Sequence, residues 1–295
     1  MSNCEVHYCN NKDLKKENVQ ALMDWLQHQP HFPPLTEYQV IIFLHSCYYN
    51  NEAAKKTIDN YLTVRKFCPE FFANRNPSNP DIQTALDLLT ISPLPKLTKE
   101  GYCIIYFRLV DTNTDKFVYN NLIKMFDMAA SIALKELGTV NGHIIVIDLE
   151  GYSLTHIMKM GVMTVKKYMF FLQEALPFRL KGFHFANAVP FMDKLMLLMK
   201  PFMKKELLEM LQVHSGNNET LFEFVDKNCL PNEIGGSVGS VFEIHNAFRQ
   251  KFFDYKNFFE EEEKLVVDES KRPGSPRNVG DIFGVEGTFK KMEID

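Results

Sequence analysis

Few residues in this chain have a type and spacing that could do covalent chemistry. Gly235, Ser237 and Gly239 form a G-x-S-x-G pattern, which in some hydrolases holds a nucleophilic serine. That chemistry needs a strand, a tight turn and a helix around the serine, and an oxyanion loop elsewhere. Here Pro231-Asn232-Glu233 precedes the pattern and the sequence has no His-Gly-Gly motif. A serine hydrolase is therefore the weaker alternative, and we predict no catalytic residue.

Metal and cofactor motifs give no stronger signal. Cys4, His7 and Cys9 are of metal-ligating types, but no clear fourth ligand accompanies them near the start of the chain. The P-loop, the His-Glu-x-x-His motif and the dinucleotide-binding glycine fingerprint are all absent from the sequence. We expect no cofactor and no metal, and a protein that binds a molecule without converting it.

An apolar helical segment beside basic residues is the most informative feature. Its apolar face and flank consist of Phe191, Met192, Leu195, Met196, Leu198, Met199, Phe202 and Met203. Such a helix is usually buried core, and the alternative is a lid with one face on a ligand cavity and another that can touch lipid. From Leu176 to Met210 there are six basic and three acidic residues, in a chain of net charge −4. This local excess fits either a solvated face or weak, reversible contact with an anionic membrane.

Composition fits a protein that can bury a large core. The 295 residues could form one large domain or two small ones. Phe (25) and Met (14) are over-used, and both residue types fill irregular apolar spaces. The net charge of −4 gives no global basic field for nucleic acid. The sequence shows no apolar signal-peptide core, and no apolar run approaches the ~18 residues that span a bilayer. We therefore expect the six scattered cysteines to be free thiols in the cytosol.

Hydrophobic periodicity divides the chain into a helical region and an α/β region. Helices are predicted around 19–26, after a capping box formed by Thr36 and Gln39, and over 51–67. The Asn- and Pro-rich loop 74–80 predicts a boundary. Beyond it, strands at 102–109, 143–149 and 182–189 alternate with helices at 116–137 and 162–176 and with two short helices over 191–211, around Pro201. This order predicts an α/β domain with a largely parallel sheet, and the continuous apolar strand 143–149 indicates a sheet covered on both faces.

The last 45 residues have a different composition. An acidic run, Glu260–Glu263, is followed by Arg272-Pro273-Gly274-Ser275-Pro276. This pattern predicts an extended tail that wraps over the body or is partly disordered. We therefore divide the chain into a helical region, residues 1–75, an α/β domain, residues 76–251, and a C-terminal tail, residues 252–295.

Several linked motifs resemble the CRAL-TRIO lipid-transfer family over about residues 18–251. They are Asp148-Leu149-Glu150-Gly151, Lys181-Gly182-Phe183-His184, Lys200-Pro201-Phe202, and Leu230-Pro231 with Gly235-Gly236, preceded by Tyr61, Arg65 and Cys68-Pro69-Glu70. Within the family, the chain is most similar to the α-tocopherol transfer protein-like members, and Arg272-Pro273-Gly274 and Ile282-Phe283-Gly284 resemble the tails of insect members.

The resemblance implies a helical N-terminal region and an α/β domain whose sheet floors a closed apolar cavity. It also implies a mobile gate helix within Val189 to Met210, which we call the gate segment. Positions that line the family's pocket correspond here to Leu122, Met125, Ala129, Ile147, Phe171, Leu172, Leu176, Phe178, Phe183, Leu195 and Met199. In the tocopherol-binding relative, the positions of Met125 and Ala129 are serines that help to hold the ligand's hydroxyl group.

The resemblance further implies binding of phosphoinositide head groups in a basic cleft. Lys56, Arg179 and Lys181 match its basic positions, two others become Glu206 and Met210, and Lys204 and Lys205 lie close by. We expect the charged ends of Arg179 and Lys181 to face water.

These observations predict a cytoplasmic, peripherally membrane-associated protein that is monomeric, binds no nucleic acid and is not an enzyme. It would bind a small hydrophobic lipid, such as a tocopherol, retinoid, carotenoid or sterol, and transfer it to membranes that contain phosphoinositides. The main alternative is a lipid-sensing scaffold that recruits a protein partner through the tail. Apolar cavities with few polar groups accept many lipids, so the sequence leaves the ligand open.

Overall fold

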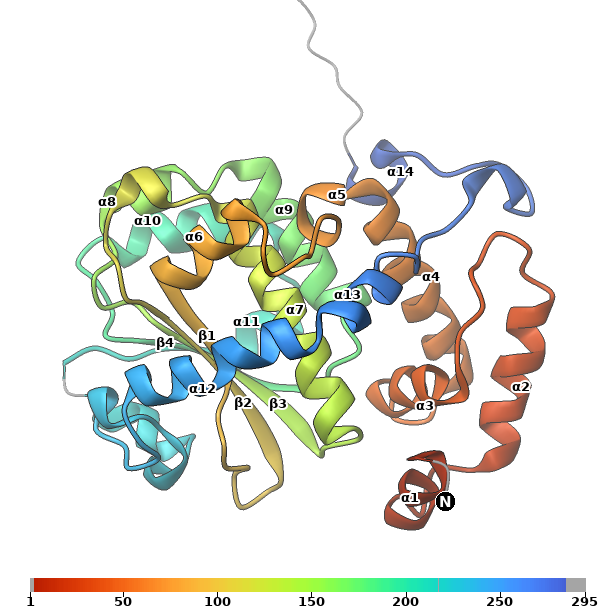
Figure 1. Ribbon diagram of the computed structural model, residues 1–295, viewed down its shortest axis with the longest axis horizontal. Coiled ribbons are helices and arrows are strands. Elements are labelled where there is room, and N and C mark those ends of the chain that lie inside the picture. The colour runs from red at the N-terminus through yellow and green to blue at the C-terminus, as the bar shows by residue number, and fades with distance from the viewer. Residues whose placement is uncertain (1–2, 217, 285–295) are drawn as a thin grey trace, which may run out of the picture.

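The N-terminal region of this computed structural model, which describes residues 3–216 and 218–284, is helical. Its helices are α1 (Asn3–Asn10), α2 (Lys16–Gln27), α3 (Glu37–Ser46), α4 (Asn51–Phe67) and α5 (Pro69–Phe72). The predicted capping box begins α3, since the Thr36 hydroxyl accepts from the Gln39 amide while Gln39 reaches back to the Thr36 amide. Figure 1 shows α1 to α4 along one side of the molecule. No helix of the described residues is long and apolar enough to cross a membrane.

A five-stranded mixed sheet follows, in the order β1-β2-β3-β4-β5. The strands are β1 (Leu89–Pro93), β2 (Tyr102–Leu109), β3 (Gly142–Asp148), β4 (Leu180–Ala186) and β5 (Leu211–Val213). Only β1 and β2 are antiparallel, so the predicted largely parallel sheet is confirmed. The two edge strands are additional to the three predicted ones. They are short, and β5 has only three residues, which is too few for an alternating pattern to appear.

Helices and turns cover both faces of the sheet. Ile105, Ile145 and Phe183 point into the larger core, beneath α7 (Tyr119–Leu137) and α9 (Val162–Phe170), while Ile104 and Ile144 point into a second core. The larger core also receives α6 (Pro80–Leu88), α8 (Leu154–Met158) and the π-helical turn η2 (Phe171–Ala175). The short turn η1 (Thr114–Lys116) lies outside it. The second is covered by η4 (Glu219–Glu223), η5 (Lys227–Cys229), η6 (Asn232–Ile234) and α12 (Val241–Asp254).

The described part of the tail lies along the N-terminal helices. After α13 (Lys256–Glu262), the chain passes η7 (Glu269–Lys271) and ends its described course with α14 (Val279–Phe283). Asp59 of α4 accepts from Arg272 and pairs with Arg277, each at 2.9 Å. Phe283 packs edge-on against Phe170 of α9, with ring centroids 5.4 Å apart. The tail thus connects the N-terminal region to the α/β domain, and residues 285–295 lie outside the described residues.

A buried charge network joins the same three regions. Arg75 is fully buried and donates to Asp127 of α7 at 2.7 Å. Arg65 of α4 approaches the other oxygen of Asp127 at 3.5 Å and donates to the Glu262 carbonyl at 3.1 Å. Removing one partner would leave a buried charge uncompensated, which typically costs about 3–5 kcal/mol. The network therefore fixes α4, α7 and α13 relative to one another.

Candidate functional site

A small apolar cavity lies between the sheet and the gate segment. Its volume is about 50 Å³. Its walls come from the sheet, α7, the segment around α8, α9 and α10 (Met192–Met199), and they are Phe107, Tyr119, Leu122, Ile123, Phe126, Ile147, Leu149, Tyr152, Met160, Tyr168, Phe183, Phe185, Leu195 and Met199. Because ligand pockets usually measure about 300–1,000 Å³, a lipid could enter only if part of this wall moved.

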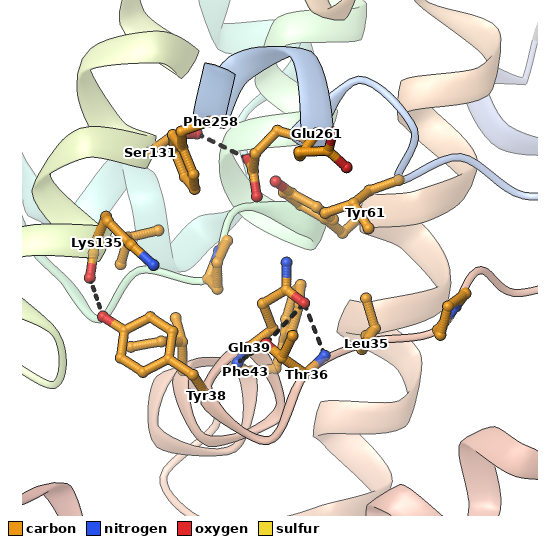
Figure 2. Close-up of a pocket in the computed structure, with 16 residues that line it drawn as sticks. Leu35, Thr36, Tyr38, Gln39, Phe43, Tyr61, Ser131, Lys135, Phe258 and Glu261 are labelled. Atoms are coloured by element: carbon orange, nitrogen blue, oxygen red, sulfur yellow. Dashed lines mark hydrogen bonds between the residues drawn. The ribbon is translucent and has the colours of Figure 1, made fainter. Parts of the chain in front are cut away.

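A second pocket, of about 470 Å³, lies between α3, α7 and α13 (Figure 2). It shares no lining residue with the first cavity, and none of the predicted site residues lines it. Helix α7 separates the two, because Leu122 and Phe126 face the first cavity whereas Ser131 and Lys135 border the second.

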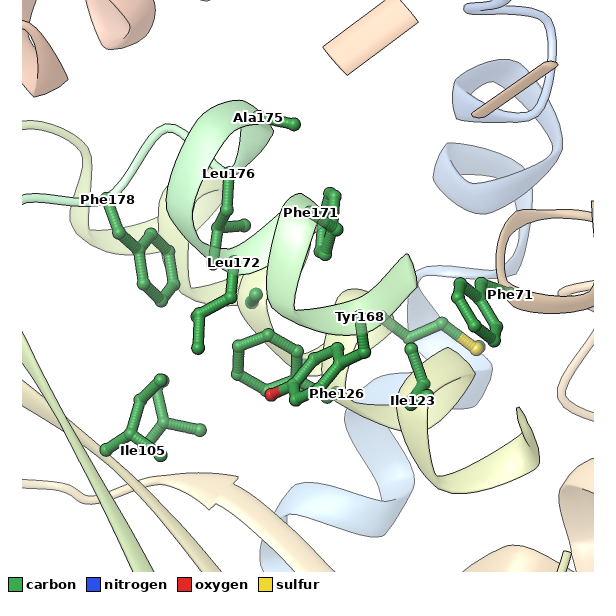
Figure 3. Packing of buried hydrophobic residues seen from close by; sticks show 14 of the residues in the cluster. Phe71, Ile105, Ile123, Phe126, Tyr168, Phe171, Leu172, Ala175, Leu176 and Phe178 are labelled. Atoms are coloured by element: carbon green, nitrogen blue, oxygen red, sulfur yellow. The ribbon is translucent and has the colours of Figure 1, made fainter. Parts of the chain in front are cut away.

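The predicted ligand-binding residues divide into two groups. Leu122, Ile147, Phe183, Leu195 and Met199 line the apolar cavity. The others are buried in the adjoining core without lining it, and they are Met125, Ala129, Phe171, Leu172, Leu176 and Phe178. Figure 3 shows Leu172, Leu176 and Phe178 directed from η2 and the following loop toward Ile105 of β2. This second group therefore occupies the space into which the cavity could extend.

Helix α10 has two different faces. Leu195 and Met199 are 2% and 5% exposed and close the cavity, whereas Leu197 is 73% exposed. Residues two positions apart on a helix point about 200° apart, so inner and outer faces alternate within this short segment. The helix contacts α9 and the following turn η3 (Lys200–Phe202), where Pro201 prevents its continuation. The gate segment continues with α11 (Lys205–Met210).

Gln173 holds the C-terminal end of α10. This residue lies in η2, a π-helical turn of the kind that is frequent at functional sites. Its amide nitrogen donates to the Phe202 carbonyl at 3.0 Å, and its oxygen accepts from the Lys204 amide at 2.6 Å. The sequence offered no signal for this role, because the contact joins residues about 30 positions apart.

Asp148 and Asn187 hold the other end of the gate segment. The buried Asp148 carboxylate accepts from Tyr106 at 2.7 Å, Arg108 at 2.5 Å and the Asn187 amide at 2.8 Å. Asn187 has a positive φ of 48° and exchanges amide hydrogen bonds with Asn218. The Asp148 motif therefore fixes the turn from which the chain leaves β4 toward α10.

Arg179 and Lys181 surround Tyr48, in the loop between α3 and α4. The Arg179 guanidinium lies 4.4 Å from the centroid of the Tyr48 ring and donates through Nε to the His45 carbonyl at 2.6 Å. Lys181 is exposed and donates to the Tyr48 hydroxyl at 2.8 Å. The expectation that both charged ends face water was wrong for Arg179, whose Nη2 is buried, because the Tyr48 and Tyr49 rings cover the guanidinium.

Glu174 of η2 connects two other predicted basic residues. Lys56 lies 3.2 Å from its carboxylate, and Lys204 forms a second ion pair with the same group. Lys205 is 85% exposed and reaches Glu209 at 3.6 Å. Only the Lys205 pair is exposed on both sides, and such pairs contribute about 0–1 kcal/mol. Glu174 is 14% exposed, whereas the side chains of Lys56 and Lys204 are 70% and 57% exposed.

The residues weighed for catalysis and metal binding are not assembled. Ser237 is exposed and its hydroxyl donates to Asn228 at 3.1 Å, so no histidine base holds it in the described structure. Gly236 instead serves packing, since a Cβ there would lie 1.9 Å from the Leu230 carbonyl oxygen. Residues 3–216 and 218–284 contain no cluster of three or more His, Cys, Asp or Glu side chains suited to a metal ion.

Two family models match the chain. Residues 90–236 match the CRAL/TRIO domain, and residues 11–82 match the Pinta-like UBA domain. The chain belongs to the CRAL-TRIO family. The matched CRAL-TRIO domain contains β1 to β5, the gate segment and the glycines that follow Leu230-Pro231.

Named CRAL-TRIO relatives cover most of the chain. The alpha-tocopherol transfer protein-like protein of Homo sapiens is 26% identical over 236 residues, which are 78% of this chain and 67% of the relative. Clavesin-1 of Xenopus laevis is 22% identical over 231 residues, 77% of this chain and 70% of that protein. The solved structure of Sfh5 has the same fold, with a TM-score of 0.50, 13% identity, and coverage of 84% of this chain and 99% of the other.

Proposed function

We propose that this CRAL-TRIO protein carries one hydrophobic lipid between the sheet and α10 and releases it at an anionic membrane. The observation that carries the proposal is the two-faced helix α10, which closes an apolar cavity with Leu195 and Met199 and exposes Leu197. One helix can thereby contact the ligand from inside and the membrane from outside. Family membership and the names of the relatives support lipid binding and transfer in general.

The closed cavity requires the gate to move. Burying roughly 400 Å² of apolar ligand at about 25 cal/mol per Å² yields on the order of 10 kcal/mol before ordering costs, so the ligand would escape into water very slowly. Contact between a membrane and the outer face of α10 would stabilise the open form and let the ligand pass directly into lipid. The six predicted residues that are now packed beside the cavity would move apart and enlarge it. All eleven predicted ligand residues would then contact the lipid.

Exposed apolar side chains and lysines support the membrane contact. Met158 and Val162 are 77% and 60% exposed, and they flank Met160, which lines the same cavity as Leu195 and Met199 of α10. Lys181 and Lys205 are exposed, and Lys56 and Lys204 share Glu174. We propose that the apolar side chains enter the interface while the lysines attract phosphoinositides. The protein would then be cytoplasmic and monomeric, with transient membrane association and no enzymatic activity.

The cavity chemistry narrows the ligand. Met125 and Ala129, in the core beside the cavity, are 1% and 0% exposed and bring no hydroxyl group to it. The only hydroxyl groups among the described wall residues belong to Tyr119, Tyr152 and Tyr168, and the other wall residues are apolar. The cavity therefore suits a ligand with a large apolar body, such as a retinoid, carotenoid, sterol or tocopherol.

A vesicle transfer assay tests the proposal. Donor vesicles would carry a fluorescent tocopherol analogue with a quencher, and acceptor vesicles would contain either phosphatidylcholine alone or added phosphatidylinositol bisphosphate. We expect the protein to accelerate transfer, and to do so more with the phosphoinositide. If the protein binds the analogue and moves none of it, the lipid-sensing scaffold is the better assignment, and if it binds none of the candidate lipids, the proposal fails.

A further inference from the structure

We propose that the 470 Å³ pocket between α3, α7 and α13 is a second ligand site, for an apolar molecule that carries one hydroxyl group. This inference goes beyond the lipid-carrying function, because the pocket and the gated cavity have no lining residue in common. Its volume falls in the range of about 300–1,000 Å³ that small-molecule sites usually have, so no helix needs to move to admit a ligand.

Apolar side chains form most of the pocket. They come from four separate segments, and they are Leu35, Ile42, Phe43, Leu134, Phe258 and Leu265. The buried network of Arg65, Arg75, Asp127 and Glu262 fixes α7 and α13 behind these walls and joins them to α4, which packs against α3. The site is thus preformed, which lowers the ordering cost of binding.

Two hydrogen-bond donors border the pocket and have no acceptor among the described residues. The Gln39 oxygen accepts from the Thr36 amide, so its amide nitrogen is left to point into the space between α3 and α13 (Figure 2). Lys135 forms no hydrogen bond or ion pair within the described part of the chain, and its ammonium lies 5.7 Å from the ring centroids of Tyr38 and Phe258. Gln39, which is half-buried, and Lys135, which is exposed, thus place two donors at the border of the apolar pocket.

An acceptor faces them from α13. The Glu262 side chain is 9% exposed. Its Oε2 accepts a hydrogen bond from the Ser131 hydroxyl at 3.3 Å and lies 4.0 Å from the Arg75 guanidinium. Its second oxygen, Oε1, has no donor among the described residues. A ligand hydroxyl group is both a donor and an acceptor of hydrogen bonds. It can therefore donate to Glu262 and at the same time accept from Gln39 or Lys135.

The charges around the pocket favour a neutral ligand. Glu261 pairs with Lys264 at 2.6 Å, whereas Glu262 lies 4.0 Å from Arg75, whose shorter ion pair is with Asp127 at 2.7 Å. An anion that reached Lys135 would also approach these two carboxylates, and a cation would meet Lys135. A hydroxyl group avoids both penalties, which distinguishes an apolar alcohol from a fatty acid or an apolar amine.

Equilibrium dialysis with radiolabelled retinol tests the second site by itself. In a Leu195→Asp background, which spoils the gated cavity, we expect retinol binding to persist. Adding Leu134→Trp, which fills the second pocket, should weaken it at least tenfold. Adding Leu137→Trp, on the same helix but 41% exposed and outside the pocket, should leave it unchanged. Loss of all binding in Leu195→Asp alone, or equal affinity with and without Leu134→Trp, would overturn the proposal.

Two measurements on the unmodified protein keep the proposal testable if the combined variant does not fold. Retinyl acetate lacks the hydroxyl proton, so we expect it to compete for the second site at least tenfold less well than retinol. A photoreactive retinol should label residues 34–43, 131–135 or 258–265, and labelling confined to residues 119–126 and 183–199 would refute the second site. That last result would still support the lipid-carrying function, so the two proposals can fail separately.

Discussion

The side-chain oxygen of Gln173 accepts a hydrogen bond from the backbone amide of Lys204 at 2.6 Å, immediately beyond the turn that ends α10. The same side chain donates to the Phe202 carbonyl and, at 2.7 Å, to its own helix at Met169. A single residue thereby ties the end of the gate to η2. Opening of α10 must either break these bonds or carry η2 with it.

Replacing Gln173 with Leu should loosen the gate. Each lost hydrogen bond contributes about 0.5–1.5 kcal/mol, so losing those to Phe202 and Lys204 should speed ligand dissociation roughly tenfold. Stopped-flow fluorescence of a bound lipid analogue measures the rate. The matched control is Gln250→Leu, which removes an exposed bond to Asp254 on α12, away from the gate. Equal dissociation rates in the two variants would show that Gln173 is not a gate anchor.

The two faces of α10 should separate ligand retention from membrane docking. Leu195→Asp places a carboxylate in the cavity wall, where an unpaired charge is strongly unfavourable, so lipid binding in solution should be lost. Leu197→Asp changes a side chain that is 73% exposed and should leave that affinity within about twofold. Its vesicle binding and transfer rate should fall instead. If both variants behave alike in both assays, the two-faced gate is wrong.

Lysine neutralisation should weaken docking without altering the cavity. Each lysine near an anionic surface contributes about 1 kcal/mol, so Lys181→Gln with Lys205→Gln should reduce binding to phosphoinositide vesicles about 30-fold at low salt. Lys264→Gln with Lys271→Gln removes two lysines of the tail, 68% and 62% exposed, as the control. We leave Arg179 unchanged, because it packs on Tyr48 and its loss would also affect folding. Vesicle sedimentation at several salt concentrations measures the affinity. If the two double variants bound phosphoinositide vesicles equally well, Lys181 and Lys205 would not belong to the docking surface.

His184 of β4, which contacts His214 just after β5, should make stability depend on pH. Burial, and then the neighbouring His214, lowers the pKa of His184 to about 4, from an ordinary value near 6.5. Between these pH values His184 binds a proton in the unfolded chain but not in the folded one. The stability that comes from keeping His184 neutral is therefore fully present above about pH 6.5 and is lost as the pH falls toward 4. The bond of 3.0 Å between the two rings would be lost with it.

Urea denaturation at pH 7.5 and pH 5 measures this effect. His184 should account for about 2 kcal/mol of the fall in the free energy of unfolding, so His184→Gln should show a smaller fall than the unmodified protein. His28→Gln, at an exposed position, serves as the control and should retain the full pH dependence. The same fall in all three proteins would exclude His184 as the cause.

Local patterns predicted the elements that form from local sequence. The capping box at Thr36, the strand at 143–149 and the helix that ends at Leu137 all appear in the structure. The hydrogen bond from Lys204 to Gln173 and the burial of Arg179 depend on contacts between residues 31 and 134 positions apart. Hydrophobic periodicity does not predict such contacts. The second pocket likewise forms where α3, α7 and α13 meet, so only the assembled fold reveals it.

The contact of Arg75 with Glu263 also bears on how the protein is made. The Arg75 amide donates to the Glu263 carboxylate, 188 residues away, at 2.5 Å, and its guanidinium donates to the Phe259 carbonyl, 184 residues away, at 3.4 Å. At a synthesis rate of about 5–20 residues per second, α13 leaves the ribosome roughly 10–40 s after Arg75 has been made. During that interval Arg75 and Asp127 lack part of their native surroundings. The Arg75–Asp127 pair can therefore gain its full set of partners only after α13 and Glu263 have been synthesised.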